Sequence, residues 1–510
     1  MKKFIALLLA LLMTVSCVGC GSTNSEGTPA VSGDKPVTDG KANDTLTVAI
    51  TDNVATLDPQ NYTRTSELTV INQIYDPLIS TDLDGNIVYM LAESYTANED
   101  GSSVDFVLRE GVKFHSGDVL TAEDVAYTLE RGVNSAAVSE LNEFSTITVV
   151  DDTHFTWEFP DVEDGEGFND LYTYIMDMGI VNKSFCEQYI TDPLDDLKLN
   201  VDGTDAYTLK EVTGNNDVTL VKFDDYYGTP ANIGTVKMKY ISGSTETAFE
   251  AGNLDFAQIG ATNFDTITAY SNVEGYKQIL NNFAVIMCNC SEGSPIADIN
   301  VRQAIAYCMN KDDITSIASN DAGVCAYNLA TPMVEYYDDV CEHFDTDVDK
   351  ANDLMKTAGY SDSNRLAIRL VCITIYPEWV SACEVIKEQL EQSYFDVSIE
   401  ETSDTSRYFA TDFDLAICAF TIGSIYQMYS AMFEEGAGLN LACINDAALQ
   451  DSFKAITDEA SAQACMKATT ESLAYIPLYY TAQFFVFDSD LTAGQYNAER
   501  ALILYKDFAW

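Results

Sequence analysis

The sequence predicts a mixed α/β protein with more than one domain, and three features of the chain support this fold class. The chain has 510 residues, which is enough for two or three domains with large cores. Hydrophobic residues make up 47% of it, so we expect it to fold rather than remain disordered. In the second half, an apolar run at 366–374 is followed by a helical pattern at 384–392, and such alternation is typical of an α/β lobe.

The N-terminal segment predicts export across a membrane. Two lysines precede an apolar run at 4–15, which is too short to span a bilayer. The run ends in a segment that resembles a bacterial lipobox, in which Cys20 becomes the lipid-modified first residue, although Cys17 stands where leucine is usual. A diacyl anchor would hold the protein stably at a membrane, and an ordinary secretory signal is the alternative. Residues 21–44 are small, polar and rich in breakers, which predicts a flexible tether.

The charge of the chain excludes two classes of partner. There are 80 acidic and 27 basic residues, for a formal net charge of −53. Such a surface repels nucleic-acid phosphates and anionic lipid headgroups, so we expect neither as a partner. The acidic residues are spread along the chain instead of forming one tail, which indicates a solvated exterior rather than an acidic active site.

The cysteines predict free thiols. Removal of Cys17 and Cys20 leaves 11 of the 13 cysteines, and an odd number cannot form a complete disulfide framework. Cys288 and Cys290 lie in an apolar, strand-like run, where small buried side chains are expected. The chain has no Cys-x-x-Cys pair, which argues against a structural zinc site.

The first half of the folded chain predicts strands and hairpins. A short strand is expected to begin at Thr45, and residues 103–108 alternate between apolar and polar side chains. Residues 147–159 predict a hairpin that turns at two aspartates. Residues 203–228 predict a second hairpin, with an Asn- and Asp-rich turn at 214–217.

The second half predicts helices as well. Asn300 is expected to cap a helix that carries Val301 and Ile305 on its inner face. Gly359 is expected to end a helix over 349–360, because glycine readily adopts the conformation that terminates helices. The chain is expected to close with a strand at 501–505.

The stretch 112–131, VKFHSGDVLTAEDVAYTLER, predicts a strand, a polar turn and a helix. Thr121 is a suitable helix N-cap, and Asp124 three residues later completes a capping box. Val125 and Leu129 then fall on one face at helical spacing.

This stretch closely resembles the signature of the extracellular solute-binding proteins that serve peptide/nickel-type ABC importers. The matching residues are Val112, Phe114, His115, Gly117, Thr121, Ala122, Glu123, Asp124, Val125, Tyr127, Leu129 and Arg131. A second signature of that family is matched at Val301, Arg302, Ala304, Ile305, Tyr307 and Ile314. A third family phrase, around residue 203, is matched except that Asp205-Ala206 replaces Gly-Pro. The resemblance covers residues 45–510.

The resemblance implies the class II periplasmic-binding-protein fold, in which a hinge joins two lobes with mixed sheets, and a small α+β domain is added. The implied divisions are a signal peptide at 1–20, a tether at 21–44, lobe I at 45–77, 191–285 and 478–510, the small domain at 78–190, and lobe II at 286–477. It also implies a monomer at the outer face of the cell membrane, whose partners are a peptide or small solute and the ABC permease subunits.

The ligand residues implied by the resemblance lie in three parts of the chain. In peptide-binding members, the phrase equivalent to 413–424 has a tryptophan where this chain has Phe420, and an aspartate where it has Gly423. That aspartate pairs with the free amino group of the peptide, because a buried ammonium needs a partner charge. Arg64 is a cation that could meet a carboxylate. The candidate ligand residues are Tyr62, Arg64, Phe283, Phe420, Thr421, Gly423, Ser424 and Tyr426.

No catalytic or metal-binding constellation is predicted. The three histidines lie far apart, and the chain has no nucleophile elbow, zinc-protease motif or phosphate-binding glycine loop. Asp345, Asp347 and Asp349 resemble the start of a calcium loop, but Lys350 and Lys356 stand where that loop needs Gly and Glu. We interpret Asp349 as a helix cap instead, and we expect no cofactor, no metal and no enzymatic activity.

The implied function is the capture of a peptide or peptide-like solute by hinge closure and its delivery to the permease. A glycoside, an opine-like compound and a chelated metal are the alternative solutes. A secreted hydrolase is the alternative from a different class, and a sensory or adhesive protein that works without a permease is another.

Overall fold

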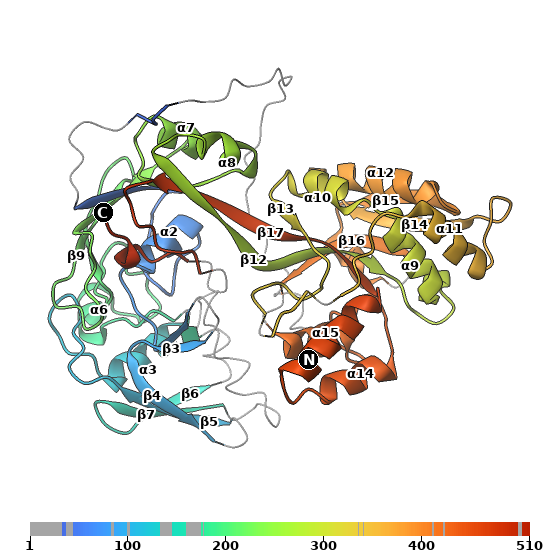
Figure 1. The fold of residues 1–510 in the computed structure, drawn as a ribbon. Coiled ribbons are helices and arrows are strands. Elements are labelled where there is room, and N and C mark those ends of the chain that lie inside the picture. The colour runs from blue at the N-terminus through green and yellow to red at the C-terminus, as the bar shows by residue number, and fades with distance from the viewer. Residues whose placement is uncertain are drawn as a thin grey trace. The chain divides into compact units, whose positions relative to one another are not determined.

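The computed structural model describes residues 33–36, 44–82, 86–98, 102–132, 145–159, 175–176, 178–334, 336–339, 341–410, 413–421, 424–497 and 502–510. The predicted export signal, Cys20 and Gly423 lie outside these residues, and so does the side chain of Tyr426. The chain forms two compact units, of which unit 1 includes 260–262 and 277–483, and unit 2 covers 31–259, 263–276 and 484–510 (Figure 1). No helix among the described residues is long and apolar enough to cross a membrane.

Unit 2 is built around a four-stranded sheet in the order β1-β10-β9-β8. The strands are β1 (Thr45–Ile50), β8 (Tyr207–Val212), β9 (Val218–Lys222) and β10 (Thr235–Tyr240). β1 runs parallel to β10, and the other pairs are antiparallel. Every second residue of β1 is buried, which is the period of a strand with one covered face. The strand predicted from Thr45 and the hairpin predicted at 203–228 are both confirmed.

A second, antiparallel sheet of unit 2 has the order β4-β5-β7-β6. Its strands are β4 (Ala92–Ala97), β5 (Ser103–Leu108), β6 (Thr146–Val149) and β7 (His154–Glu158), and β2 (Ile79–Thr81) and β3 (Ile87–Tyr89) form a separate pair. Helix α3 (Ala122–Arg131) buries Val125 and Leu129 in the core cluster of this region. These elements lie within 78–190, so the predicted extra domain has a core of its own inside unit 2, and its independence remains a prediction.

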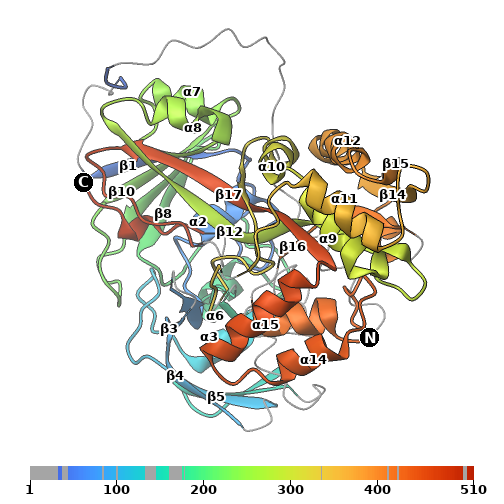
Figure 2. The same cartoon turned by 45° about the vertical axis from the view of Figure 1, so that its right-hand side comes forward.

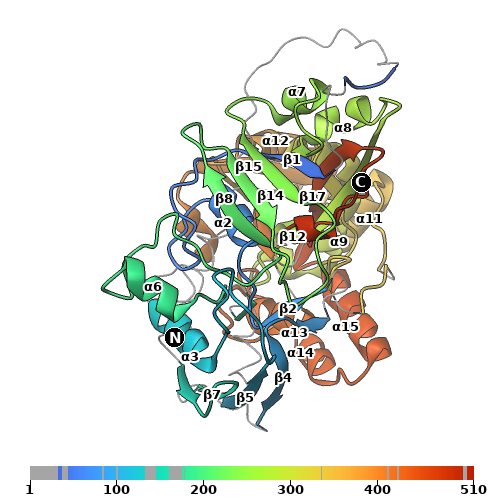
Figure 3. The same ribbon diagram turned by 90° about the vertical axis from the view of Figure 1, so that its left-hand side faces the viewer.

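The remaining helices of unit 2 are short. They are α2 (Thr65–Ile71), α6 (Lys183–Tyr189), α7 (Thr245–Glu250), α8 (Ala261–Ile267), whose first residues belong to unit 1, and the single turn η5 (Tyr505–Asp507). α3 and α6 lie side by side (Figure 3). The backbone N–H of Lys183 at the start of α6 donates to the Asp124 carboxylate, 2.9 Å away, which links the two helix N-termini.

Unit 1 contains most of a mixed seven-stranded sheet with the order β11-β17-β12-β16-β14-β15, and β13 pairs with β17 beside it. The strands are β11 (Phe256–Ile259), β12 (Val273–Cys288), β13 (Gly323–Cys325), β14 (Leu366–Ile373), β15 (Phe395–Thr402), β16 (Leu415–Thr421) and β17 (Tyr475–Asp488). β14 is parallel to β15 and β16, whereas β12 and β16 are antiparallel. β12 and β17 contribute residues to both units.

Helices cover both faces of this sheet in unit 1 (Figure 2). One face carries α9 (Ile299–Cys308), α10 (Lys311–Ser319), α11 (Val348–Thr357) and α12 (Pro377–Glu391), and the other carries α13 (Ile425–Met428), the π-helical turn η4 (Tyr429–Phe433), α14 (Ala447–Lys454) and α15 (Glu459–Glu471). Neighbouring residues of one strand point to opposite faces, so Leu370 joins the first core and Val371 the second. The predicted α/β lobe is confirmed.

Two predicted helix caps are wrong by a short distance. The cap of α9 is Asp298, whose carboxylate accepts the N–H of Asn300, and Asn300 is already inside the helix. The cap of α11 is Asp347, whose carboxylate accepts the N–H of Lys350, and Asp349 lies in the first turn. In both cases, several residues of suitable chemistry stand close together, and the path of the preceding chain selects one of them.

Two other predictions differ from the structure. α12 begins at Pro377, ahead of the predicted start at 384, because Pro377 suits the first helical position and Trp379 already packs in the core. The strand predicted at 501–505 is wrong, since Leu502 makes only an isolated bridge with Asn497 and the chain then enters the turn η5.

Lys35 lies in the range predicted as a flexible tether, but it is 2% exposed. Its ammonium is 2.7 Å from the carboxylate of Asp488, donates to the carbonyl of Leu254, and lies 3.6 Å from the centre of the Phe249 ring. The desolvated charge is therefore compensated, and residues 33–36 pack on unit 2. The 11 cysteines outside the predicted signal are free thiols in the structure, and eight of them are buried.

Candidate functional site

The stretch 112–131 makes structural contacts within unit 2. In its turn, His115 donates its backbone N–H to the carbonyl of Gly203, and its ring Nε2 is 2.9 Å from the carbonyl oxygen of Asp205. The ring also packs edge-on against Phe223, at 4.8 Å between centroids. Burial lowers the pKa of His115, so the ring is held in its neutral form. In its helix, the N–H of Thr121 donates to Asp124, which confirms the predicted capping box.

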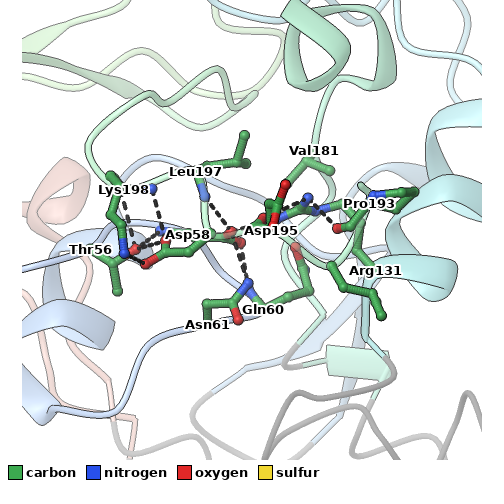
Figure 4. A network of polar contacts seen from close by, with 12 residues as sticks. Thr56, Asp58, Gln60, Asn61, Arg131, Val181, Pro193, Asp195, Leu197 and Lys198 are labelled. Carbon is green, nitrogen blue, oxygen red and sulfur yellow. Dashed lines mark hydrogen bonds and ion pairs between the residues drawn. The ribbon is translucent and has the colours of Figure 1, made fainter. Parts of the chain in front are cut away.

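Arg131, the last residue of the same stretch, forms a buried ion pair with Asp58 (Figure 4). Both side chains are fully buried. The guanidinium also donates to the carbonyl of Pro193, at 2.6 Å. The Asp58 carboxylate accepts N–H bonds from Leu197 at 2.9 Å and from Gln60 at 3.1 Å.

This network stabilises the fold, and only Nε of Arg131 lacks a hydrogen-bond partner among its described charged groups. Each charge of the Asp58–Arg131 pair meets the opposite charge and further hydrogen bonds, which is what a buried ion pair requires. Water and solutes cannot reach it, because neither side chain is exposed. The most recognisable stretch of the sequence is therefore a structural element that connects α3 to the loop after β1.

That loop also contains the predicted ligand residues Tyr62 and Arg64. The Arg64 guanidinium is 3.1 Å from the buried carboxylate of Glu67, and 44% of the Arg64 side chain remains exposed. Glu67 also accepts N–H bonds from the backbone of Ala55 and Thr63. Burial by itself would raise the pKa of Glu67, but these hydrogen bonds outweigh it and hold the pKa below its usual value. Arg64 is thus positioned by Glu67 with part of its charge open to solvent.

Two of the predicted ligand residues in unit 1 lie next to one another in its sheet. Phe283 of β12 and Phe420 of β16 are direct cross-strand partners, and their ring centroids are 6.1 Å apart. Phe283 is fully buried and Phe420 is 7% exposed, and both belong to one core cluster. Their burial favours a core role for these rings, on the opposite face of the sheet from the adjacent side chains of Asn282 and Thr421.

A row of uncharged polar side chains follows the two rings along the same strands. Asn282 pairs with Thr421 across the sheet, and its amide donates to the Thr421 hydroxyl at 3.0 Å. The hydroxyl of Thr481 on β17 lies 3.4 Å from the Asn282 carbonyl groups. One residue earlier, Asn281 accepts from the hydroxyl of Thr331 at 2.8 Å. Asn281 and Thr331 are buried, and Asn281 points to the opposite face of β12 from Asn282, so we call Asn282, Thr421 and Thr481 the polar row.

Sequence reasoning found only Thr421 in the polar row. The available signal was the Asn281-Asn282 pair, which interrupts the otherwise apolar second half of β12. The alternation of strand residues alone did not show that Thr481 lies beside that pair, since the two positions are about 200 residues apart. Of the other predicted ligand residues, Ser424 lies three positions after Thr421 in the chain, and Tyr62 and Arg64 belong to unit 2.

Unit 2 holds a cavity of about 200 Å³, and Tyr62 is one of its lining residues. The acidic residues Asp76 and Asp205 and the ammonium of Lys506 lie at one end of it. In the part of the chain that the structure describes, no three His, Cys, Asp or Glu side chains are grouped so as to hold a metal ion.

Comparisons with known proteins agree with the fold. A family model described as bacterial extracellular solute-binding proteins, family 5 Middle, matches residues 86–434. The nickel-binding periplasmic protein of Escherichia coli (strain K12) is 24% identical over 393 residues, which cover 72% of this chain and 73% of that protein. The oligopeptide-binding protein AppA of Bacillus subtilis (strain 168) is 24% identical over 304 residues, and the match spans 58% of this chain and 55% of AppA.

Among solved structures, HbpA2 from Haemophilus parasuis superposes with a TM-score of 0.80 at 17% sequence identity. The superposition covers 91% of this chain and 99% of that one. At this identity, the likeness establishes the fold of the chain and says nothing about its solute.

Proposed function

Because the chain belongs to the bacterial extracellular solute-binding proteins, family 5, we propose that it captures a peptide or peptide-like solute and delivers it to an ABC importer. The polar row of unit 1 carries the peptide assignment. Its amide and hydroxyl groups can donate to and accept from the C=O and N–H groups of a peptide backbone without a charged partner. The relative AppA is an oligopeptide-binding protein, which supports the same solute class.

The proposal includes capture by hinge closure. The chain changes from one unit to the other at 276/277 within β12 and at 483/484 within β17. These positions differ from the predicted lobe boundaries at 285/286 and 477/478. A hinge needs only a few residues that absorb a change in backbone angles, so we propose that the hinge lies in these two strands.

We also propose that the protein is a monomer anchored outside the cell membrane through lipid on Cys20, and that it has no enzymatic activity. The sequence supports the anchor through the basic start, the short apolar run and the lipobox-like segment. A chelated metal is the alternative solute, since one relative is a nickel-binding protein. Such a metal would arrive with its chelator, because the described residues offer no ligand cluster of their own.

The test is native mass spectrometry of the chain from Gly21 onward, purified without refolding from cells grown in rich medium. We expect a co-purified peptide, and the same peptide should raise the melting temperature without being consumed. A non-peptide adduct would overturn the solute class, and appearance of a product would overturn the binding role.

A pair of variants tests the polar row itself. Thr421→Val removes the hydroxyl that Asn282 contacts, so peptide affinity should fall by up to about tenfold, the value of one hydrogen bond. Thr156→Val is the matched control, because it removes a hydrogen-bonded strand hydroxyl from unit 2, and it should leave the affinity unchanged. Equal affinities for the two variants would remove the polar row from the proposed site.

A further inference from the structure

The cavity of unit 2 has an apolar wall and an acidic end. It measures about 200 Å³, several times the volume of about 30 Å³ that a water molecule occupies in the liquid. The apolar wall consists of side chains from α2, β3, the following loop and the C-terminal segment, among them Leu68, Ile71, Val88, Met90 and Leu502. The space therefore suits a small organic molecule with a hydrocarbon part.

The acidic end holds three acidic side chains and one basic side chain. The ammonium of Lys506 lies 2.7 Å from a carboxylate oxygen of Asp205 and 3.8 Å from Oδ1 of Asp76. A third carboxylate, that of Asp507, lines the cavity from an exposed position. Among the described residues that line the cavity, Lys506 faces three acidic side chains, and its closest ion pair is with Asp205.

Three buried polar atoms of the lining find no hydrogen-bond partner among the described residues. They are Oδ1 of Asp76, which is fully buried, the hydroxyl of Tyr75, which is 3% exposed, and the hydroxyl of Thr81, which is 6% exposed. The other carboxylate oxygen of Asp76 accepts from the hydroxyl of Thr204 at 3.1 Å. Buried polar atoms are nearly always paired in folded proteins, so these three atoms indicate that a polar partner is missing from the cavity.

The pKa of the Asp76 carboxyl is raised by its surroundings. Burial and the neighbouring Asp205 raise its pKa to about 8, against the opposing effect of Lys506. The carboxyl is therefore mostly protonated at neutral pH and would ionise when a further cation arrives. The titratable or charged groups around it are Asp205, Lys506, Tyr226, Tyr227 and, at the rim, Asp507.

We propose that this cavity binds a small aliphatic ammonium ion, with its charged group at Asp76 and its alkyl chain against the apolar wall. The ammonium donates to Oδ1 of Asp76 and supplies the cation for the carboxylate that forms when Asp76 ionises, and its tail removes apolar surface from water. A carboxylate ligand would meet excess negative charge at the same place. The inference uses residues of unit 2 alone and does not depend on the proposed transport function.

Binding is coupled to the release of a proton. The protonated amine meets a neutral Asp76 carboxyl, the carboxyl gives its proton to solvent, and the resulting carboxylate pairs with the ammonium. Alkylamines, like the lysine side chain with its pKa of about 10.4, stay protonated well above pH 8. Affinity should therefore rise with pH until the Asp76 carboxyl is ionised in the free protein, near pH 8.

The experiment uses three probes of similar shape, which are n-butylammonium, n-butanol and butyrate, titrated into the purified chain by isothermal calorimetry at pH 6 and pH 8.5. We expect saturable binding of butylammonium only, with an affinity at least about tenfold higher at pH 8.5. Butanol binding as tightly as butylammonium, or an affinity independent of pH, would overturn the proposal. Absence of saturable binding of any probe would also overturn it and would mean that the cavity holds water only.

Two variants and a control test where the ammonium binds. Asp76→Asn keeps the shape but not the charge, and it should abolish the pH dependence and most of the affinity. Val88→Phe fills the cavity from a strand position that is 36% exposed, so it should block binding while the fold is kept. The control is Glu93→Gln, which removes one exposed acidic charge from the same unit and should change nothing. Unchanged binding in Val88→Phe would place the ligand elsewhere and overturn the proposal.

Discussion

Unit 2 contains two buried charge clusters that differ in how their charges are balanced. In the first, Asp58 and Arg131 form a one-to-one pair that backbone groups also contact, although Nε of Arg131 has no hydrogen-bond partner among the described residues. In the second, Lys506 faces Asp76 and Asp205 together, and Asp76 keeps an oxygen without a hydrogen bond among the described residues.

The difference separates a structural role from a binding role. A charge-balanced pair that is closed to solvent cannot be reached by a ligand, and its removal damages only the fold. An unbalanced cluster beside a cavity costs stability until a ligand completes it, which is common at functional sites. The two clusters can be compared directly by substitution, because both lie in unit 2.

The largest effect is expected for Arg131→Met. It leaves the Asp58 carboxylate buried without its cation, so the free energy of unfolding should fall by about 3–5 kcal/mol, as measured by urea denaturation. A loss below about 1 kcal/mol would show that the pair is not the structural centre of this region.

Glu67→Gln should have the next largest effect. Unlike Asp58, which pairs with a buried cation, the Glu67 carboxylate is stabilised mainly by N–H groups. The loss should be about 1.5–3 kcal/mol, the range for hydrogen bonds to a charged group. The folded-state pKa of Glu67 is lowered, so its contribution is complete above the usual pKa of a glutamate and disappears as the pH falls through the lowered value. Urea denaturation at pH 7 and pH 3 should therefore show a smaller deficit of the variant at pH 3 than at pH 7.

For Asp76→Asn, the change in the free energy of unfolding relative to wild type should vary with pH in the direction opposite to that for Glu67→Gln. The folded-state pKa of Asp76 is raised, so this group favours the folded state at acidic pH, and its contribution is lost as the pH rises from about 4 to about 8. Relative to wild type, the variant should gain at least about 1.4 kcal/mol, the value of one pKa unit, between pH 5 and pH 8.5. Parallel stability curves for the two proteins would contradict the raised pKa.

Lys183→Met should have the smallest effect. Its ammonium is 3.1 Å from Glu123, but the two side chains are 38% and 61% exposed, so solvent screens the pair. We expect a change of about 0–1 kcal/mol in the same denaturation experiment. A loss as large as that of Arg131→Met would mean that burial does not explain the difference between ion pairs in this unit.

Local patterns were enough to predict many elements of the fold. The capping box of Thr121 and Asp124, the strand from Thr45 and the hairpin at 203–228 all depend on residues close together in sequence, and all are confirmed. The wrong caps, Asn300 and Asp349, are errors among close neighbours, because several residues with cap chemistry stood side by side. The predicted strand at 501–505 failed because apolar composition alone does not provide a partner strand.

The candidate site was less predictable. The sequence indicated Phe283, Phe420 and Thr421, and the structure places these three side by side on β12 and β16. It did not indicate Asn282 or Thr481, since strand alternation does not state which strand lies next to which.

The sequence by itself therefore determined the family, the alternation of strands and helices, and the capping of α3, because each of these depends on short-range patterns. Only the tertiary structure decided which charges meet. Arg131 reaches Asp58 across 73 residues of chain, and Lys506 reaches Asp205 across 301. No local propensity relates such distant positions, and the balance of charge in each cluster, which separates the structural pair from the proposed binding site, exists only once the chain has folded.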